Sequence, residues 1–124
     1  YYARSLQDIS ALEKVKKTLK VLCLGHCPKI EDYSVLEKME NLQTLIIYGN
    51  HKISDIQFIS KIKSLKRFRF SVNVLDGDLS PCLKLEEATS MTNRKHYNLK
   101  DEELPKNYDC PFGNEGIEEW MLYW

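Results

Sequence analysis

The stretch that decides the fold runs from residue 42 to residue 64 and reads LQTLIIYGNHKISDIQFISKIKS. Its first half has the form LxxLxL, which places Leu45 and Ile47 on one face of a strand and the residue between them on the other. Its second half spaces apolar residues three apart, as a helix does, and Ser54 or Asp55 can cap the start of that helix. The stretch therefore predicts a strand, a tight bend and a helical return.

The same pattern recurs on both sides of this stretch. Residues 19–41 read LKVLCLGHCPKIEDYSVLEKMEN, a third unit opens at Leu65 with LKRFRFSVN, and a degenerate fourth opens at Leu85 with LEEATSMTN. The unit starts lie 23, 23 and 20 residues apart. The segment that begins at Leu6 matches the second half of a unit, so the strand half of that unit is absent or very short. Such repeats predict stacked strands that form a parallel sheet over one continuous core.

The LxxLxLxxN/C motif and the IxDIxxI stretch at 53–59 resemble the leucine-rich repeat family, and the repeat length resembles its short bacterial, internalin-like class. The resemblance implies an α/β leucine-rich repeat solenoid. It would have a curved parallel sheet of about four strands, a helical or irregular convex side and a C-terminal cap. Residues 1–93 would form the solenoid, with a partial first repeat, and residues 94–124 the capping segment. The third return contains Gly77 and Pro81, which favour an extended or 3₁₀ conformation over an α-helix.

The bends after the strands carry a recurring polar residue, namely Asn50, Asn73 and Asn93, with Cys27 in the first unit. A buried amide at such a bend can bond backbone groups that the bend leaves unpaired, so we expect these asparagines to be buried.

The four cysteines, Cys23, Cys27, Cys82 and Cys110, are irregularly spaced in a chain that is not cysteine-dense. This usage favours free thiols, and with them a reducing, cytoplasmic location.

Composition narrows the classes of partner. The chain has 124 residues, with 18 Lys plus Arg against 18 Asp plus Glu, and a formal charge of zero. Nucleic-acid binding rests on excess positive charge, and so does attraction to anionic membranes, so we expect neither partner. The chain starts at Tyr1 without a Met, which is compatible with a fragment of a longer protein.

The sequence shows no constellation that indicates chemistry. Cys23, His26 and Cys27 suggest a zinc site but lack a second ligand pair at the usual spacing. A Cys23–His26 catalytic pair would need a hydrogen bond between its members and a third, orienting group. We therefore predict no catalytic residue, no metal site and no cofactor.

Residues between the core positions of each strand are expected to face the concave surface. Apolar or aromatic side chains there, beside a basic row, are what protein-binding hot spots use. The alternative is that Lys66 and Arg67 pair with Glu86 and Glu87 as a solvated face. The predicted protein-binding residues are Ile46, Tyr48, Lys66, Arg67, Arg69, Glu87 and Met91.

The resemblance implies a non-catalytic module that binds a protein on its concave face. A bacterial, toxin-neutralising immunity protein is one such role, and we expect a monomer rather than a dimer. The alternatives are a fragment or adaptor domain of a larger surface-exposed repeat protein, or a self-associating structural module. The aromatic residues around Trp120 and Trp124 either cover the last coil as a cap or form an exposed patch that binds a partner.

Overall fold

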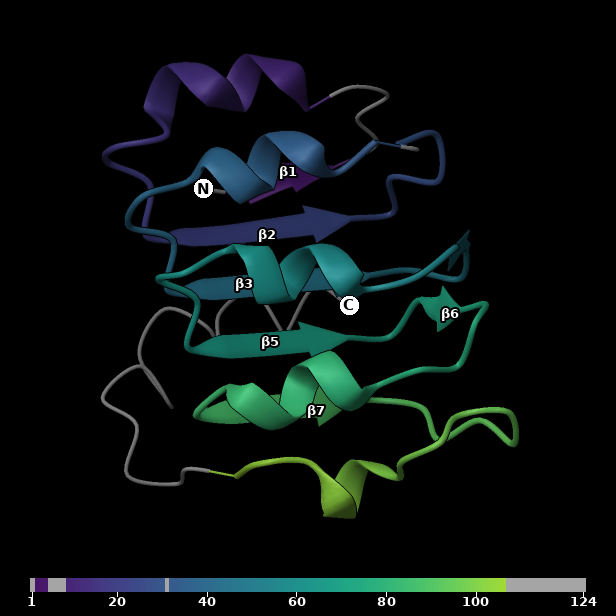
Figure 1. Ribbon diagram of the computed structural model, residues 1–124. Helices are drawn as coiled ribbons and strands as arrows, with labels where there is room; N and C mark the ends of the chain where they lie inside the picture. The colour runs from purple at the N-terminus through teal and green to yellow at the C-terminus, as the bar shows by residue number, and fades with distance from the viewer. Residues whose placement is uncertain (1, 5–8, 31, 107–124) are drawn as a thin grey trace.

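The computed structural model describes residues 2–4, 9–30 and 32–106. Five parallel strands form one sheet in the order β1-β2-β3-β5-β7 (Figure 1). Four of them correspond to the four predicted units, and the additional strand is the three-residue β1, which supplies the short strand half of the first unit. The bounds are β1 Tyr2–Arg4, β2 Val21–Gly25, β3 Thr44–Tyr48, β5 Arg67–Phe70 and β7 Glu87–Ser90.

Short helices cover one face of this sheet (Figure 1). They are η1 Ser10–Val15, η2 Ser34–Lys38, η3 Gln57–Lys61 and η4 Ser80–Lys84, and they pack against one another in sequence order. All four are 3₁₀ helices, so the expectation for the third return is confirmed, and the other returns are helical in the same way. In a 3₁₀ helix the side chains at i and i+3 lie above one another, which matches the strict spacing of Ile56, Ile59 and Ile62.

Each repeat is joined to the next by the same backbone hydrogen bonds. The amides of Gln43, Lys66 and Glu86 donate to the carbonyls of Lys20, Gln43 and Lys66, at 2.8, 2.9 and 2.9 Å. The donor positions keep the 23- and 20-residue intervals of the sequence pattern. The repeat units of the structure therefore begin at the positions that the sequence pattern predicts.

Three of the helical returns begin with the same hydrogen bond, in which an aspartate side chain accepts from the backbone amide two residues further along the chain. Asp32 accepts a hydrogen bond from the amide of Ser34, Asp55 from Gln57 and Asp78 from Ser80, at 2.9, 3.0 and 3.0 Å. Asp55 thus bonds the first residue of η3, although the N-cap position itself is taken by Ile56, which makes no side-chain cap. The three carboxylates hold the chain as it turns from the loop into the next helix.

The core lies between the helices and the sheet. It is formed by alternate strand residues, among them Leu22, Leu45 and Phe68, together with the apolar side of the helices. Phe68 and Phe70 stack within it with ring centroids 5.1 Å apart. No helix in the described residues is long and apolar enough to cross a bilayer.

The bends differ from the prediction of a buried asparagine at each. Asn50 is exposed, and so is Asn93, whose side-chain oxygen accepts from the amide of Asp101 at 2.9 Å. Asn73 is half-buried and belongs to β6 Asn73–Val74, which pairs with β4 Lys52–Ile53 in a second, two-stranded sheet. This small sheet satisfies backbone groups that a side-chain amide would otherwise serve.

Residues 94–106, the described part of the predicted capping segment, pack against the last repeats. The hydroxyl of Tyr97 donates to the carbonyl of Val72 at 3.1 Å and accepts from the amide of Val74 at 3.0 Å. Leu104 is buried in the core, and the amide of Ala88 on β7 donates to the carbonyl of Pro105 at 2.9 Å. Residues 107–124, with the predicted aromatic cap, lie outside the described residues.

A candidate protein-binding face

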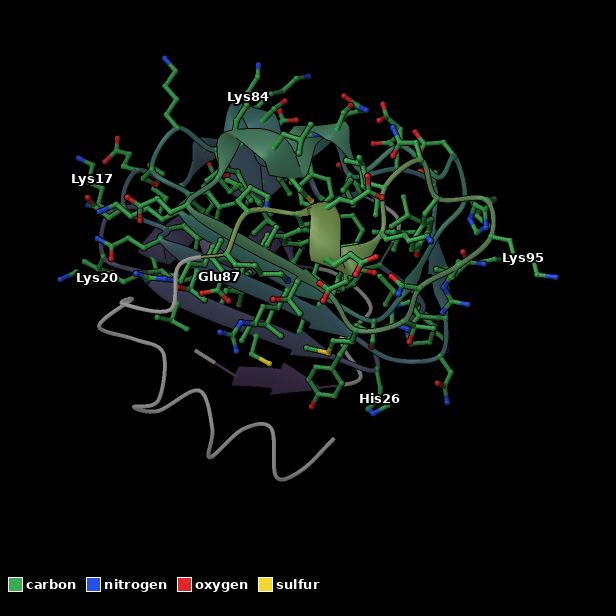
Figure 2. All side chains as sticks on the ribbon, turned by 90° about the horizontal axis from the view of Figure 1, so that it is seen from below. Lys17, Lys20, His26, Lys84, Glu87 and Lys95 are labelled. Atoms are coloured by element: carbon green, nitrogen blue, oxygen red, sulfur yellow. The ribbon has the colours of Figure 1, made fainter. Side chains whose placement is uncertain are left out.

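The sheet face opposite the helices, predicted as the concave surface, is called here the outer face. In Figure 2, Lys84 lies on the helical layer, whereas His26 lies on the other side of the sheet. The strand register brings side chains of the outer face into rows across the sheet. One row contains Cys23, Ile46, Arg69 and Thr89; the row before it contains Val21, Thr44, Arg67 and Glu87; and Gly25 lies beside Tyr48.

An apolar cluster occupies the middle of the outer face. Cys23 and Ile46 are 0% exposed and Tyr48 is 2% exposed, and these three residues form a buried group separate from the main core. The Tyr48 ring meets the ring of His26 edge-on, with centroids 5.1 Å apart. It lies so close over Gly25 that a Cβ there would overlap the phenol.

Charged side chains continue the outer face toward the β7 edge. The Nε and Nη2 atoms of Arg69 donate to Oε1 of Glu87, at 3.1 and 2.7 Å. The two side chains are only 13% and 9% exposed, so solvent screens this ion pair weakly. Arg67 is 3% exposed. The sequence analysis gave pairing of Lys66 and Arg67 with Glu86 and Glu87 as an alternative, whereas Glu87 forms an ion pair with Arg69.

The structure places five of the seven predicted binding residues on the outer face: Ile46, Tyr48, Arg67, Arg69 and Glu87. The other two lie just outside the strands. Lys66 precedes β5 and is exposed, and Met91 follows β7 and is half-buried. The expected exposure of Ile46 and Tyr48 is wrong, because both are buried. A strand pattern shows which face a side chain takes, but it does not show whether that face is covered.

The described cysteines do not gather into a reactive site. Cys23, Cys27 and Cys82 are buried thiols outside any disulfide, which agrees with the predicted thiols for the described cysteines. Cys23 belongs to the outer-face cluster and Cys27 to the main core. Burial raises the pKa of both Cys23 and Cys82 to about 12, which keeps these thiols protonated. No group of three or more His, Cys, Asp or Glu side chains suited to a metal ion is present in the described part of the chain.

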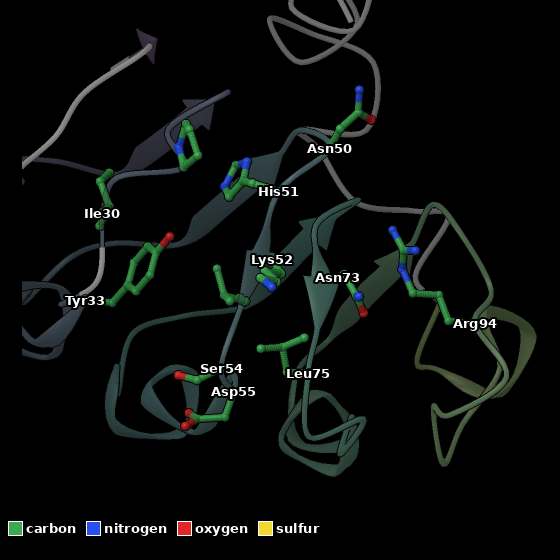
Figure 3. A pocket seen from close by; sticks show the side chains of 12 residues that line it. Ile30, Tyr33, Asn50, His51, Lys52, Ser54, Asp55, Asn73, Leu75 and Arg94 are labelled. Carbon is green, nitrogen blue, oxygen red and sulfur yellow. The ribbon is translucent and has the colours of Figure 1, made fainter.

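A cavity of about 610 Å³ opens at the loops that follow the strands. Its lining combines apolar Tyr33 and Leu75 with polar His51, Asn73 and Arg94. Figure 3 shows Lys52 and Asn73 near its centre, between His51 and Arg94. Burial lowers the pKa of His51, and the nearby His26 lowers it further, so this imidazole is neutral near pH 7.

Sequence reasoning missed this cavity because its residues follow the bends, where the repeat pattern carries no apolar signal. Nε2 of His51, Oδ1 of Asn73 and Nε of Arg94 are buried there without a hydrogen-bond partner among the described residues. Such atoms are suited to a small polar group or water rather than to an apolar ligand.

Comparison with known proteins identifies the repeat. Residues 17–61 match the family model described as Leucine Rich repeats (2 copies). No curated protein and no solved structure matches the chain significantly. The matched range contains β2, β3 and the helical returns after them, and the same hydrogen bonds continue into β5 and β7. Residues 17–61 are therefore similar to leucine-rich repeats, a type of repeat that generally mediates protein–protein binding, and the neighbouring strands continue the same α/β repeat arrangement.

Proposed function

We propose that this protein is a non-catalytic module that binds another protein through the outer face of its sheet. The observation that carries the proposal is the gathering of Ile46, Tyr48, Arg67, Arg69 and Glu87 on one face, apart from the main core. Aromatic and arginine side chains are the usual anchors of protein interfaces, and on this face Arg69 and Glu87 keep 13% and 9% of their side-chain surface exposed.

The chemistry of the face favours a protein partner over a small substrate. Its charged groups are held in a low-exposure ion pair that positions Arg69, and exposed Lys66 stands beside them. A partner with an acidic surface complements the exposed Lys66. The finer proposal, which rests on the resemblance to short internalin-like repeats, is a monomeric, cytoplasmic immunity protein that neutralises a bacterial toxin.

The test uses two matched double variants that change side chains outside the buried core. Lys66→Glu with Met91→Asp alters the residues that directly flank the outer-face strands β5 and β7, and Lys84→Glu with Leu83→Asp makes the same kinds of change on the helical layer. Circular dichroism verifies that both remain folded. Proteins captured from a lysate of the source organism are identified by mass spectrometry, and the affinity of the captured protein is then measured by calorimetry.

We expect the outer-face variant to bind the captured partner at least tenfold more weakly than wild type, and the helical-layer variant to bind it as wild type does. The reverse pattern would place the interface on the helical layer. Toxic activity in the partner, inhibited by this protein, would support the immunity role. Light scattering that shows a concentration-dependent dimer of the protein alone would favour the self-associating module.

A further inference from the structure

Most of the lysines of this chain lie at one edge of the sheet. The strands are parallel and a helix leads back to the next strand in each repeat, so the helix-to-strand connections lie where the strands begin (Figure 1). Counted from the lysine in the last turn of each helix, these connections are residues 14–20, 38–43, 61–66 and 84–86. They contain nine lysines and two glutamates, although the whole chain has equal numbers of basic and acidic residues. We call this edge the lysine rim.

The opposite edge of the sheet lacks this excess of positive charge. The described residues that follow the strands, within 26–33, 49–56, 71–79 and 91–103, hold five basic and seven acidic side chains. Figure 2 shows Lys17 of the rim beside Lys20 at one end of the molecule. Because acidic residues elsewhere offset the rim in the sum, the formal charge of zero does not measure the attraction that the rim exerts on an anion.

Part of the rim is a row of lysines with a local role. The last turns of η1 to η4, which pack against one another in sequence order, each carry one lysine, namely Lys14, Lys38, Lys61 and Lys84. A positive charge at this position suits the negative end of the helix dipole. Two of the four also form exposed ion pairs, Lys38 with Glu13 at 3.6 Å and Lys61 with Glu37 at 3.7 Å. These contacts explain the row without a partner.

Other lysines of the rim have no such role. Lys17, Lys20, Lys63 and Lys66 are exposed and lie between helix and strand, and none of the four forms an ion pair within the described part of the chain. The amide of Gln43 donates to the carbonyl of Lys20, and the amide of Lys66 donates to the carbonyl of Gln43. The backbones of Lys20 and Lys66 are therefore two strand spacings, or about 10 Å, apart. Like charges at about one Debye length repel one another, so a bound anion stabilises this edge.

We propose that the lysine rim binds an acidic segment of a protein partner. An ammonium group on a flexible four-carbon stem attracts carboxylates without requiring a fixed geometry. The four connections of the rim contain no Arg and no aromatic residue, the side chains that read bases and stack on them. The exposed large apolar side chains of the described residues, Leu75 and Leu83, both lie outside the rim, so the rim offers no apolar anchor to a lipid surface. These observations favour a protein over a nucleic acid or a membrane.

The rim is a second surface beside the outer face, and Lys66 at the start of β5 adjoins both. The assignment of the partner to the protein class rests on the proposed function, because it follows from the similarity to repeats that generally mediate protein–protein binding. The charge separation itself rests on the sequence and the strand topology.

The test uses a fluorescein-labelled oligoglutamate peptide as the probe and measures its binding by fluorescence anisotropy. The rim variant reverses the charge of three exposed lysines: Lys17→Glu, Lys20→Glu and Lys63→Glu. The matched control makes the same change in net charge at three exposed lysines outside the rim: Lys29→Glu, Lys52→Glu and Lys95→Glu. Circular dichroism verifies that both variants are folded.

We expect wild type to bind the peptide at low ionic strength, with an affinity that falls as salt is added. The rim variant is expected to bind it at least tenfold more weakly, and the control variant within about threefold of wild type. No binding by wild type, or equal weakening in the two variants, would overturn the proposal.

A DNA duplex and vesicles that contain phosphatidylserine serve as probes for the other classes of anionic partner. Binding of either probe that requires the rim lysines, without binding of the peptide, would exclude the assignment to a protein. The assay needs no partner from the source organism and leaves Lys66 and Met91 unchanged. Its failure is therefore distinguishable from the failure of the outer-face variant to weaken binding of the captured partner.

Discussion

Gly25 and Tyr48 show how closely the outer face is fitted at the scale of single residues. They are cross-strand neighbours on β2 and β3, and the Tyr48 ring occupies the space that a Cβ at position 25 would need. Glycine serves here through its small size, because the residue lies in a regular strand. The repeat pattern alone gives no reason for a glycine at this strand position.

We predict that Gly25→Ala destabilises the protein by about 1–3 kcal/mol, because the added methyl group must displace the Tyr48 ring. Urea unfolding measures the change in the free energy of unfolding. In a Tyr48→Ala background the ring is absent, so the same substitution is expected to cost far less. An equal cost in both backgrounds would show that the glycine is needed for another reason.

Removing one partner of the ion pair between Arg69 and Glu87 is predicted to destabilise the protein strongly, whereas replacing both residues with apolar ones is predicted to change its stability little. Because both side chains are largely buried, Glu87→Gln removes the charge that faces Arg69 in this ion pair and is expected to cost about 3–5 kcal/mol. The double substitution Arg69→Met with Glu87→Leu is expected to be much closer to neutral. The exposed pair of Lys38 and Glu13 is the control, since Lys38→Met is expected to change stability by less than about 1 kcal/mol. Equal effects at the two pairs would contradict the prediction.

At the scale of elements, the same aspartate-to-amide hydrogen bond begins three of the helical returns. Asp32, Asp55 and Asp78 lie 23 residues apart, and each accepts from the amide two residues on, where a 3₁₀ helix begins. The returns are too short for several α-helical turns, and their apolar residues three apart suit the 3₁₀ geometry. Aspartate spacing and apolar spacing are both visible in the sequence, so this element was within reach of prediction.

Asp78 makes the stability of the fourth helical return depend on pH. Its carboxylate accepts from the backbone amide and hydroxyl of Ser80, and from the side chains of Asn98 and Gln57, and these bonds lower its pKa below the usual 3.8. A lowered pKa in the folded state contributes stability that is present above pH 3.8 and is lost as the pH falls through the folded value.

We therefore predict that Asp78→Asn is less stable than wild type at pH 7, and that the difference narrows as the pH falls below about 3.8. Thermal unfolding of both proteins from pH 7 to pH 3 measures this. Glu86→Gln, which neutralises an exposed carboxylate at the start of the next unit, controls for the loss of charge alone. A difference that stays constant over the whole range would exclude the carboxylate as its source.

At the scale of the whole molecule, the reactivity of the thiols of Cys23, Cys27 and Cys82 measures how well the folded chain excludes solvent. Cys23 lies on one side of the sheet, Cys27 and Cys82 lie in the core on the other, and all three are buried. With a pKa of about 12, Cys23 and Cys82 are thiolates to about one part in ten thousand at pH 8.

We predict that in a Cys110→Ser variant none of these three thiols reacts with Ellman's reagent at pH 8 on the time scale on which the urea-unfolded chain reacts completely. The absorbance of released thionitrobenzoate gives the number of thiols. Rapid release of one equivalent in the native protein would identify an accessible thiol, and mass spectrometry would assign it.

The period and phase of the apolar residues were enough to predict the repeat. Apolar residues recur at intervals of about 23 residues, with strand spacing in the first half of each unit and helical spacing in the second. Stacked units in a parallel sheet are the arrangement that buries all of these residues in one core. The same alternation placed Ile46, Tyr48, Arg67, Arg69 and Glu87 on the outer face. Only the three-dimensional packing decided that Ile46 and Tyr48 are buried, that Glu87 pairs with Arg69, and that a second small sheet replaces buried asparagines at the bends. These outcomes depend on contacts between residues distant in the chain, which a local pattern does not encode.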